Sequence, residues 1–355
     1  MEHTIQVQEY SGKPIIDLDL RKVSSVVYTA AAAGPPPKRA HLRITVNDDG
    51  GEKQLVFKGS HAEATWMLMV PASRSGDLQG AMELVTSRVK RLTRVVDALV
   101  RVSALERADL PYPQKFVARR ARLMSNDEED GITLAILSDI RVTNRTFVEV
   151  ACGSNGGNSG FLALECGWRG LMVDGDEERL AAARRRFRYA DVTFANSFVT
   201  KENIDCLLAE NGIDGDIDLM SIDIDGNDFW IWEGLTAATP RLIIIEYNSY
   251  FGPDKSVVVP YSADFDRHNY INFFYGASIQ AMTKLAARKG YRLIATEPRG
   301  HNAYFLRNDV APSIPATDPA AAWRLLDKYE LRVSAHREDP YAFAERAGIE
   351  LVQVD

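Results

Sequence analysis

Cysteine, histidine and long apolar runs are scarce in this sequence. Only three of the 355 residues are cysteines and six are histidines. The cysteines, Cys152, Cys166 and Cys206, show no CxxC spacing, so a disulfide scaffold or a structural zinc site is disfavoured. We therefore expect them to be small side chains of the packed interior.

The sequence also lacks a membrane segment and an excess of positive charge. No apolar run approaches the ~20 residues that span a bilayer, and the first ten residues, MEHTIQVQEY, do not have the charged-then-apolar pattern of a signal peptide. The formal net charge is −7, which disfavours a nucleic-acid partner. These absences predict a cytoplasmic protein with no membrane partner.

The first 58 residues indicate a small antiparallel β unit. Segments such as HLRITV and KQLVF alternate apolar and polar residues, which is typical of half-buried strands. The NDDGG run between these two segments favours a hairpin, because Asp and Gly tolerate the positive φ of a tight turn.

A long amphipathic helix is predicted next, over about Leu78–Ala104. Its apolar residues are spaced alternately three and four apart, as in a heptad seam. One interpretation is a coiled-coil contact between copies of the chain, which would make it a homo-oligomer. The other is a helix packed on its own β unit, and this is the favoured one.

The length and the order of these patterns predict two domains and a tail. A junction with two prolines and the acidic run SNDEED separates the β unit and its helix from the rest of the chain. We expect an N-terminal domain over 1–125, a second domain over 126–312, and a helical C-terminal extension over 313–355.

Strands and helices alternate in the second domain. The expected strands are rich in Val, Ile and Leu without polar alternation, so both of their faces should be buried under helices. This predicts a doubly wound α/β fold with a parallel sheet. A last segment, YRLIATEPRGHNAYFLRN, forms two short strands around a Pro-Arg-Gly turn, which adds an antiparallel hairpin. The expected parallel strands are 146–151, 170–174, 192–195, 217–223 and 241–247.

A glycine-rich turn follows the first of these strands. Glycines allow the chain to turn sharply and to approach a ligand closely, and Glu149 before the turn suits a cationic amino group. The expected cofactor contacts in the turn are Gly153, Asn155 and Gly156. A dinucleotide site would favour GxGxxG, whereas the spacing here is GxxGGxxG.

The next two strands end in further polar candidates. Asp174 can accept hydrogen bonds from both hydroxyls of a ribose, and Asp176 is the alternative, with a helix N-cap as its structural role. Asn196 and Ser197 follow the third strand, where an adenine edge would lie, although a turn or cap role is equally compatible.

Acidic and amide groups follow the fourth and fifth strands. Because the carboxyl ends of parallel strands share one edge, Asp223, Asp225, Glu246 and Asn248 should converge there. Asp225, Glu246 and Asn248 could coordinate Mg²⁺ through hard oxygens. The alternative is a turn at Asp225, a helix cap at Asp228, and direct ligand contacts by Glu246.

The stretch 247–275 is dense in Tyr, Phe and Asn, which suits a cover over the substrate better than a simple connection. It contains His268, one of two histidines in the second domain. We consider His268 a candidate general base or substrate contact, and an ordinary surface residue is the alternative.

With these residues assembled, the segment from about Thr143 to Asn308 resembles class I S-adenosylmethionine-dependent methyltransferases, particularly the FkbM-type group associated with natural-product and sugar O-methylation. The motifs are VEVACGSNGGNS with GLMVDGDEE, LMSIDIDGNDFWIWEGL, IIIEYNSYFGP, and the terminal hairpin, with which this fold closes and nicotinamide-binding domains usually do not. The resemblance implies that Glu149 and Gly153 hold the methionyl end, Asp174 the ribose, and Asp223 with Asp225 the floor of the transfer site.

The expected function is methyl transfer from S-adenosylmethionine to an oxygen, less readily a nitrogen, of a small molecule such as a sugar or natural-product intermediate. His268, Asp223 and Asp225 are the candidate catalytic residues, and Asp223 is also counted among the cofactor contacts. A nicotinamide-dependent oxidoreductase is the rival enzyme, and a non-catalytic cofactor-binding scaffold is the rival outside enzymology.

Overall fold

The chain forms two compact units, 1–97 and 98–355. The computed structural model describes the backbone of six strands in the first unit, and residues 110–271, 273–324 and 339–355 of the second. The division at Asp97 lies inside the range expected for the N-terminal domain. Residues 110–125 therefore belong with the second unit, where Phe116 is fully buried in the core.

The described part of the first unit is antiparallel β structure. Two three-stranded sheets are present, with orders β2-β1-β6 and β3-β4-β5. The predicted hairpin is confirmed, since β4 and β5 pair from Ala40↔Gly59 to Asp48↔Gly51. The helix predicted over 78–104 lies outside the described residues. The strands are β1 (Thr4–Val7), β2 (Ile16–Asp19), β3 (Val23–Ala30), β4 (Ala40–Asp48), β5 (Gly51–Gly59) and β6 (Leu68–Met69).

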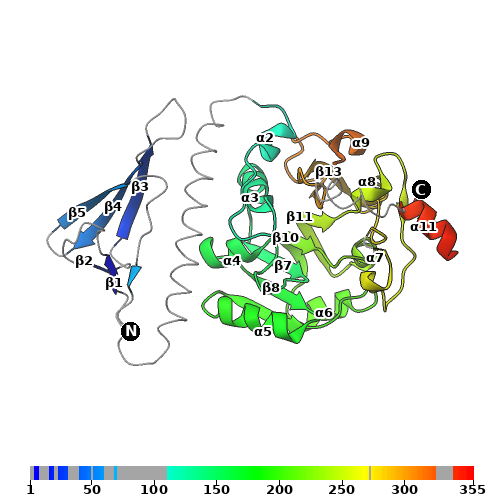
Figure 1. Cartoon of the computed structure of the whole chain (residues 1–355), viewed down its shortest axis with the longest axis horizontal. Helices are drawn as coiled ribbons and strands as arrows, with labels where there is room; N and C mark the ends of the chain where they lie inside the picture. The colour runs from blue at the N-terminus through cyan, green and yellow to red at the C-terminus, as the bar shows by residue number, and fades with distance from the viewer. Residues whose placement is uncertain are drawn as a thin grey trace. The chain divides into compact units, whose positions relative to one another are not determined.

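The second unit is organised around a seven-stranded sheet of order β13-β14-β11-β10-β7-β8-β9 (Figure 1). The neighbouring strands from β9 to β11 are parallel, and β14 pairs antiparallel with both β11 and β13. The predicted α/β fold class is thereby confirmed: a Rossmann-like sheet that ends in an antiparallel hairpin. The strands are β7 (Thr146–Val150), β8 (Arg169–Asp174), β9 (Val192–Asn196), β10 (Gly215–Ile222), β11 (Ala238–Glu246), β13 (Tyr291–Thr296) and β14 (Asn302–Arg307).

Helices cover both faces of this sheet. One face packs against α6, α7 and α8, and the other against α3, α4 and α5. Alternate residues of each central strand enter the two cores: Ile243 belongs to the first and Ile244 to the second. This double burial explains why the strands read as unbroken apolar runs. The helices are α2 (Gln114–Val117), α3 (Glu129–Ile140), α4 (Gly160–Glu165), α5 (Glu177–Arg186), α6 (Ile204–Glu210), α7 (Asp228–Gly234) and α8 (Ile279–Arg288).

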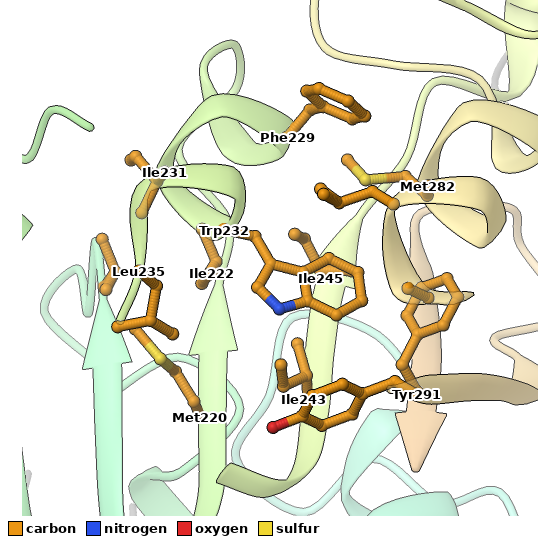
Figure 2. Close-up of a cluster of buried hydrophobic side chains, with 14 of the residues drawn as sticks. Met220, Ile222, Phe229, Ile231, Trp232, Leu235, Ile243, Ile245, Met282 and Tyr291 are labelled. Atoms are coloured by element: carbon orange, nitrogen blue, oxygen red, sulfur yellow. The ribbon is translucent and has the colours of Figure 1, made fainter. Parts of the chain in front are cut away.

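Trp232 of α7 is the largest fully buried side chain in the first of these cores. Figure 2 shows its indole among Ile243, Ile245 and Tyr291. The ring lies 5.7 Å from the Tyr291 ring in an edge-on arrangement and 5.0 Å from the Phe305 ring. Burial of an aromatic side chain on this scale contributes a few kcal/mol (~3) to stability, so α7 is held firmly on the sheet beside the ends of β10 and β11.

The C-terminal residues pack on the segment that follows β11. Strand β15 (Val352–Gln353) pairs with β12 (Val257–Val258), and the hydroxyl of Tyr341 in α11 (Pro340–Ala347) donates to the carbonyl of Phe251. A helical extension is predicted for this tail, and its described part has α9 (Pro319–Ala322) as well as α11. Among the described helices, none has the length and apolarity needed to cross a membrane.

Candidate functional site

The strand order reverses between β7 and β10, which are neighbours at the centre of the sheet. In open parallel sheets, ligands bind beside the carboxyl ends of the strands at such a reversal. Glu149 at the end of β7 pairs in register with Ser221 at the end of β10. We call this edge of the sheet, from the tip of β9 to the tip of β11, the carboxyl edge.

The glycine-rich turn folds over Glu149. The carboxylate is 1% exposed and accepts hydrogen bonds from the Asn158 backbone N–H at 3.0 Å and the Ser159 hydroxyl at 2.6 Å. Gly157 has φ +54°, and a Cβ there would overlap the Glu149 carboxylate. Glu149 therefore supports the turn from beneath, and contact with a cofactor's amino group stays a prediction.

Burial controls the protonation of Glu149. Removal from water raises the pKa of this carboxyl to about 7, although the hydrogen bonds from Ser159 and Asn158 act to lower it. A buried carboxyl that titrates near neutrality is characteristic of functional sites.

Asp174 joins the turn to the tip of β8. One of its oxygens accepts a hydrogen bond from the Gly153 N–H at 2.7 Å, and the other from the Asp176 N–H at 2.9 Å. Each carboxylate oxygen can accept a second bond, so ribose hydroxyls could still bind. Asp176 instead caps α5, accepting from the N–H groups of Glu178 and Arg179, which is the structural role expected of it.

The remaining residues predicted in the turn have structural contacts of their own. The Asn155 amide donates to the Met124 carbonyl at 3.1 Å. Gly156 has φ +86°, and a Cβ there would collide with the Phe187 ring. Both residues thus fix how the turn packs, and their contacts with a cofactor stay a prediction.

Beyond β9, Asn196 and Ser197 both bond to the main chain of Asp174. The Asn196 amide donates to the Asp174 carbonyl at 3.0 Å, and the Ser197 N–H donates to the same oxygen at 3.1 Å. Phe198 follows them, and its side chain is 80% exposed while its ring lies so close to Gly175 that a Cβ there would collide with it. The sequence patterns do not single out Phe198, although an aromatic residue two positions after a strand at this edge was a usable signal for a candidate contact.

Three carboxylates meet at the ends of β10 and β11. One oxygen from each of Asp223, Asp225 and Glu246 lies within 4.8 Å of the others. We call this set the acid triad. Asp225 is ion-paired with Arg267, whereas no hydrogen bond to Glu246 Oε2 is found within the described residues, and this side chain is 5% exposed. The convergence expected of these three acids is present.

The turn that carries two of these acids is held by a fourth. The Asp228 carboxylate accepts from the Ile224 N–H at 2.9 Å and the Gly226 N–H at 3.0 Å. Asp225 has φ +59°, a left-handed conformation that is uncommon outside glycine and often found at functional sites. Burial and the neighbouring carboxylates raise the pKa values of Asp223 and Glu246 well above their usual range.

Asn248, predicted with the metal ligands, has its side chain committed elsewhere. The amide is fully buried and donates to the carbonyls of Phe273 and Tyr275 at 2.9 and 2.8 Å. Its oxygen accepts from the Tyr250 N–H. Asn248 therefore organises the segment 247–275 rather than offering a free oxygen to the acid triad.

His268 lies on a single 3₁₀ turn, Arg267–Asn269. Its side chain is 80% exposed, and its Nδ1 is 2.7 Å from the Asp266 carboxylate. Its neighbour Arg267 reaches Asp225, so the turn lies near the acid triad. Phe265 lies against Gly226 and stacks on Tyr270 with ring centroids 5.2 Å apart, which places aromatic side chains beside the triad.

Comparison with solved structures finds methyltransferases at low identity. The methyltransferase domain of bacterial CtHen1 is 16% identical, and the match covers 50% of this chain and 97% of that chain with a TM-score of 0.34. An S-adenosylmethionine-dependent methyltransferase from Clostridium acetobutylicum is 12% identical over 62% of this chain and 98% of that chain, also at 0.34. The N-terminal domain of EvdMO1 with SAH bound is 13% identical over 52% and 81%, with the same TM-score.

The sequence matches no protein-family model and no curated protein. At identities and TM-scores this low, the solved structures carry no argument about what this chain does.

Proposed function

We propose that the protein transfers a methyl group from S-adenosylmethionine to an oxygen atom of a small hydroxylated molecule. The observation that supports this most is the carboxyl edge itself. Three features lie side by side along it, on both sides of the point where the strand order reverses. They are the carboxylate at the tip of β8, the glycine-rich turn after β7, and the acid triad at the ends of β10 and β11. We also propose that the chain is of the FkbM type, on the motifs that it shares with that group.

The residues at this edge suit the parts of the cofactor in order. The Asp174 oxygens suit the ribose hydroxyls, and the exposed Phe198 ring beside Gly175 suits the flat face of adenine. The turn from Gly153 to Gly157 would then carry the methionyl end past Glu149. In this order the sulfonium would lie on the side of the acid triad.

The chemistry asks little of the protein beyond placement. When bound, S-adenosylmethionine supplies an electrophilic methyl: a carbon–oxygen bond forms as the carbon–sulfur bond breaks, the electron pair stays on sulfur, and the hydroxyl proton leaves. The chain's own task is to hold the acceptor in line with that bond, which is worth several kcal/mol (~7 or more) when the geometry is good. We keep His268 as the candidate base that accepts this proton. Because its side chain is exposed, a bound acceptor would have to cover it.

A nicotinamide-dependent oxidoreductase is the less favoured alternative. The sheet ends in an antiparallel hairpin, and the three-carboxylate cluster at the ends of β10 and β11 has no role in hydride transfer. A non-catalytic scaffold would not need the three converging carboxylates of the acid triad. Association of copies through the 78–104 segment stays a prediction, because that segment lies outside the described residues.

Calorimetric titration with S-adenosylhomocysteine tests the proposal. We expect saturable binding, and Asp174→Asn should raise the Kd about tenfold or more, because a hydrogen bond to a charged group is lost. Asp176→Asn is the matched control: it removes the same charge two residues away, asparagine is an equally good cap, and the Kd should stay within about twofold. Binding of NAD with no heat from S-adenosylhomocysteine would contradict the proposal.

A further inference from the structure

We propose that Asp223, Asp225 and Glu246 form a binding site for a divalent metal cation. Three carboxylate oxygens from the ends of two adjacent strands lie within 4.8 Å of one another. Hard cations such as Mg²⁺, Mn²⁺ and Ca²⁺ take oxygen ligands at about 2.0–2.6 Å, so a single ion could contact all three oxygens after small rotations of the side chains.

Glu246 gives the second, independent indication. Its side chain is only 5% exposed, and its Oε2 has no hydrogen-bond partner within the described residues. A buried oxygen of this kind normally has a partner, and leaving it without one costs about 1–3 kcal/mol. Glu246 also contributes a carboxylate oxygen to the acid triad, so a ligand bound there would contact this carboxylate.

The charge balance points to a cation rather than an anion or a neutral group. Asp225 is ion-paired with Arg267, whose side chain is 40% exposed. Within the described residues, no ion pair to Asp223 or Glu246 is present. One guanidinium therefore faces three carboxylates, and it reaches only the outermost of them. A divalent ion among the three would neutralise the charge that Arg267 leaves uncompensated.

The turn is already shaped for such an ion. Asp228 fixes the backbone at Ile224 and Gly226, and Asp225 has the left-handed conformation described above. The donor set contains only carboxylate oxygens, which favours Mg²⁺, Mn²⁺ or Ca²⁺ over ions that prefer nitrogen or sulfur ligands. Asn248 is not in the set, because both N–H groups of its amide and its oxygen already have partners in the segment 247–275.

Arg267 would compete with the metal ion for the Asp225 carboxylate. Its guanidinium is ion-paired with the Asp225 carboxylate, so a metal ion that binds Asp225 would displace it. Arg267 belongs to the segment predicted to cover the acceptor, and its release would couple metal binding to the position of that cover. The role of the ion rests on the proposed function, since its open positions would receive the oxygens of the acceptor, but the site itself does not.

Manganese binding to the full chain tests the site directly. The protein is stripped with EDTA, exchanged into metal-free buffer without cofactor, and titrated with MnCl₂ while the electron paramagnetic resonance signal of free Mn²⁺ is recorded. We expect one saturable site. Glu246→Gln should weaken it about tenfold or more, and Asp264→Asn, which removes an exposed charge from the same covering segment, should leave it within about twofold. Arg267→Gln should tighten it, which a purely structural ion pair would not do.

Two results would overturn the site. One is the absence of saturable Mn²⁺ binding by the unaltered chain, and the other is equal Mn²⁺ affinity in the unaltered chain and Glu246→Gln. A cooperative urea-unfolding transition of Glu246→Gln, like that of the unaltered chain, shows that this variant is folded. Mn²⁺ binding without S-adenosylhomocysteine binding would contradict the proposed function and support the metal site. S-adenosylhomocysteine binding without Mn²⁺ binding would contradict the metal site and support the proposed function.

Discussion

Asp218 and Asp223 lie toward opposite ends of strand β10 and have opposite surroundings. Asp218, toward the amino end, is fully buried and accepts hydrogen bonds from the N–H groups of Thr143, Asn144 and Arg145 and from the Arg241 guanidinium at 2.7 Å. Asp223, just past the carboxyl end, has neighbouring carboxylates where Asp218 has donors.

The pKa values follow these surroundings. Burial acts to raise the pKa of Asp218, but the hydrogen bonds from Arg241 and the backbone outweigh it, and the pKa is lowered. Burial and like charges both raise the pKa of Asp223. The first aspartate holds the start of β7 to the sheet, and we propose that the second contacts a ligand. The partners of the two side chains differ, although the residue type is the same.

The same substitution at the two ends should have opposite effects on stability. Asp218→Asn leaves Arg241, which is 8% exposed, without its charge partner, and should lower the free energy of unfolding by about 3–5 kcal/mol. Urea unfolding monitored by tryptophan fluorescence measures this. Asp216→Asn, which breaks an exposed ion pair with Arg307, is the control and should cost at most about 1 kcal/mol. Equal losses of unfolding free energy in Asp218→Asn and Asp216→Asn would contradict the claim that the buried ion pair contributes more to stability than the exposed one.

Asp223→Asn should instead leave the free energy of unfolding unchanged or raised, because it removes a crowded carboxylate that accepts no hydrogen bond from the part of the chain that the structure describes. Methyl transfer to hydroxylated acceptors, followed with methyl-labelled S-adenosylmethionine, should fall about 100-fold or more, since the group lies at the proposed floor of the transfer site. If Asp223→Asn is destabilised as strongly as Asp218→Asn, the two ends of β10 do not differ in the way described here. If it retains full turnover, Asp223 does not have the role proposed for it.

Stability should fall as the pH rises through neutrality. The pKa of Glu149 is 4.5 ordinarily and about 7 in the folded protein, so the folded state keeps a proton that the unfolded chain has lost. Between about pH 6 and pH 8 this group alone should reduce the free energy of unfolding by about 1 kcal/mol.

Glu149→Gln should flatten that dependence while keeping the fold, because glutamine has the same shape and retains an oxygen for the Asn158 N–H. Subtracting its urea-unfolding profile from that of the unaltered chain isolates the contribution of Glu149 from those of the other buried acids. A difference that is constant between pH 6 and 8 would mean that Glu149 is charged throughout, like Asp218.

Phe198→Ala should have the smallest of these effects. The side chain is 80% exposed, so its removal should change the free energy of unfolding by less than about 0.5 kcal/mol. Loss of stacking on adenine should weaken S-adenosylhomocysteine about fivefold in calorimetry. Tyr189→Ala removes an equally exposed aromatic ring, at 81%, from beyond the end of α5, and affinity should not change. Equal effects of the two variants would exclude a specific role for Phe198.

Much of the fold could be predicted from the sequence because its signals are local. Strands β10 and β11 are apolar runs buried on both faces, and Asp176 precedes α5 in a capping position. The convergence of Asp223, Asp225 and Glu246 could be predicted as well, since parallel strands bring their carboxyl ends to one edge whatever their separation in the chain.

The remaining details depend on contacts between distant segments. Asn248 was expected at a metal, but its amide bonds to carbonyls at 273 and 275, and no periodicity predicts which carbonyls a folded loop will present. Arg267 reaches Asp225 across 42 residues. Glu149 lies beneath the turn because Gly157 leaves room for its carboxylate, which is a packing relation rather than a motif.

A crystal structure with S-adenosylhomocysteine bound is the most direct test of the contrast between the two ends of the sheet. We expect the ribose hydroxyls on Asp174, the adenine beside Phe198, and the sulfur facing Asp223 and Glu246 at the carboxyl edge. Electron density for the ligand at the amino edge beside Asp218, or a ribose away from Asp174 with the sulfur turned from the acid triad, would contradict this arrangement.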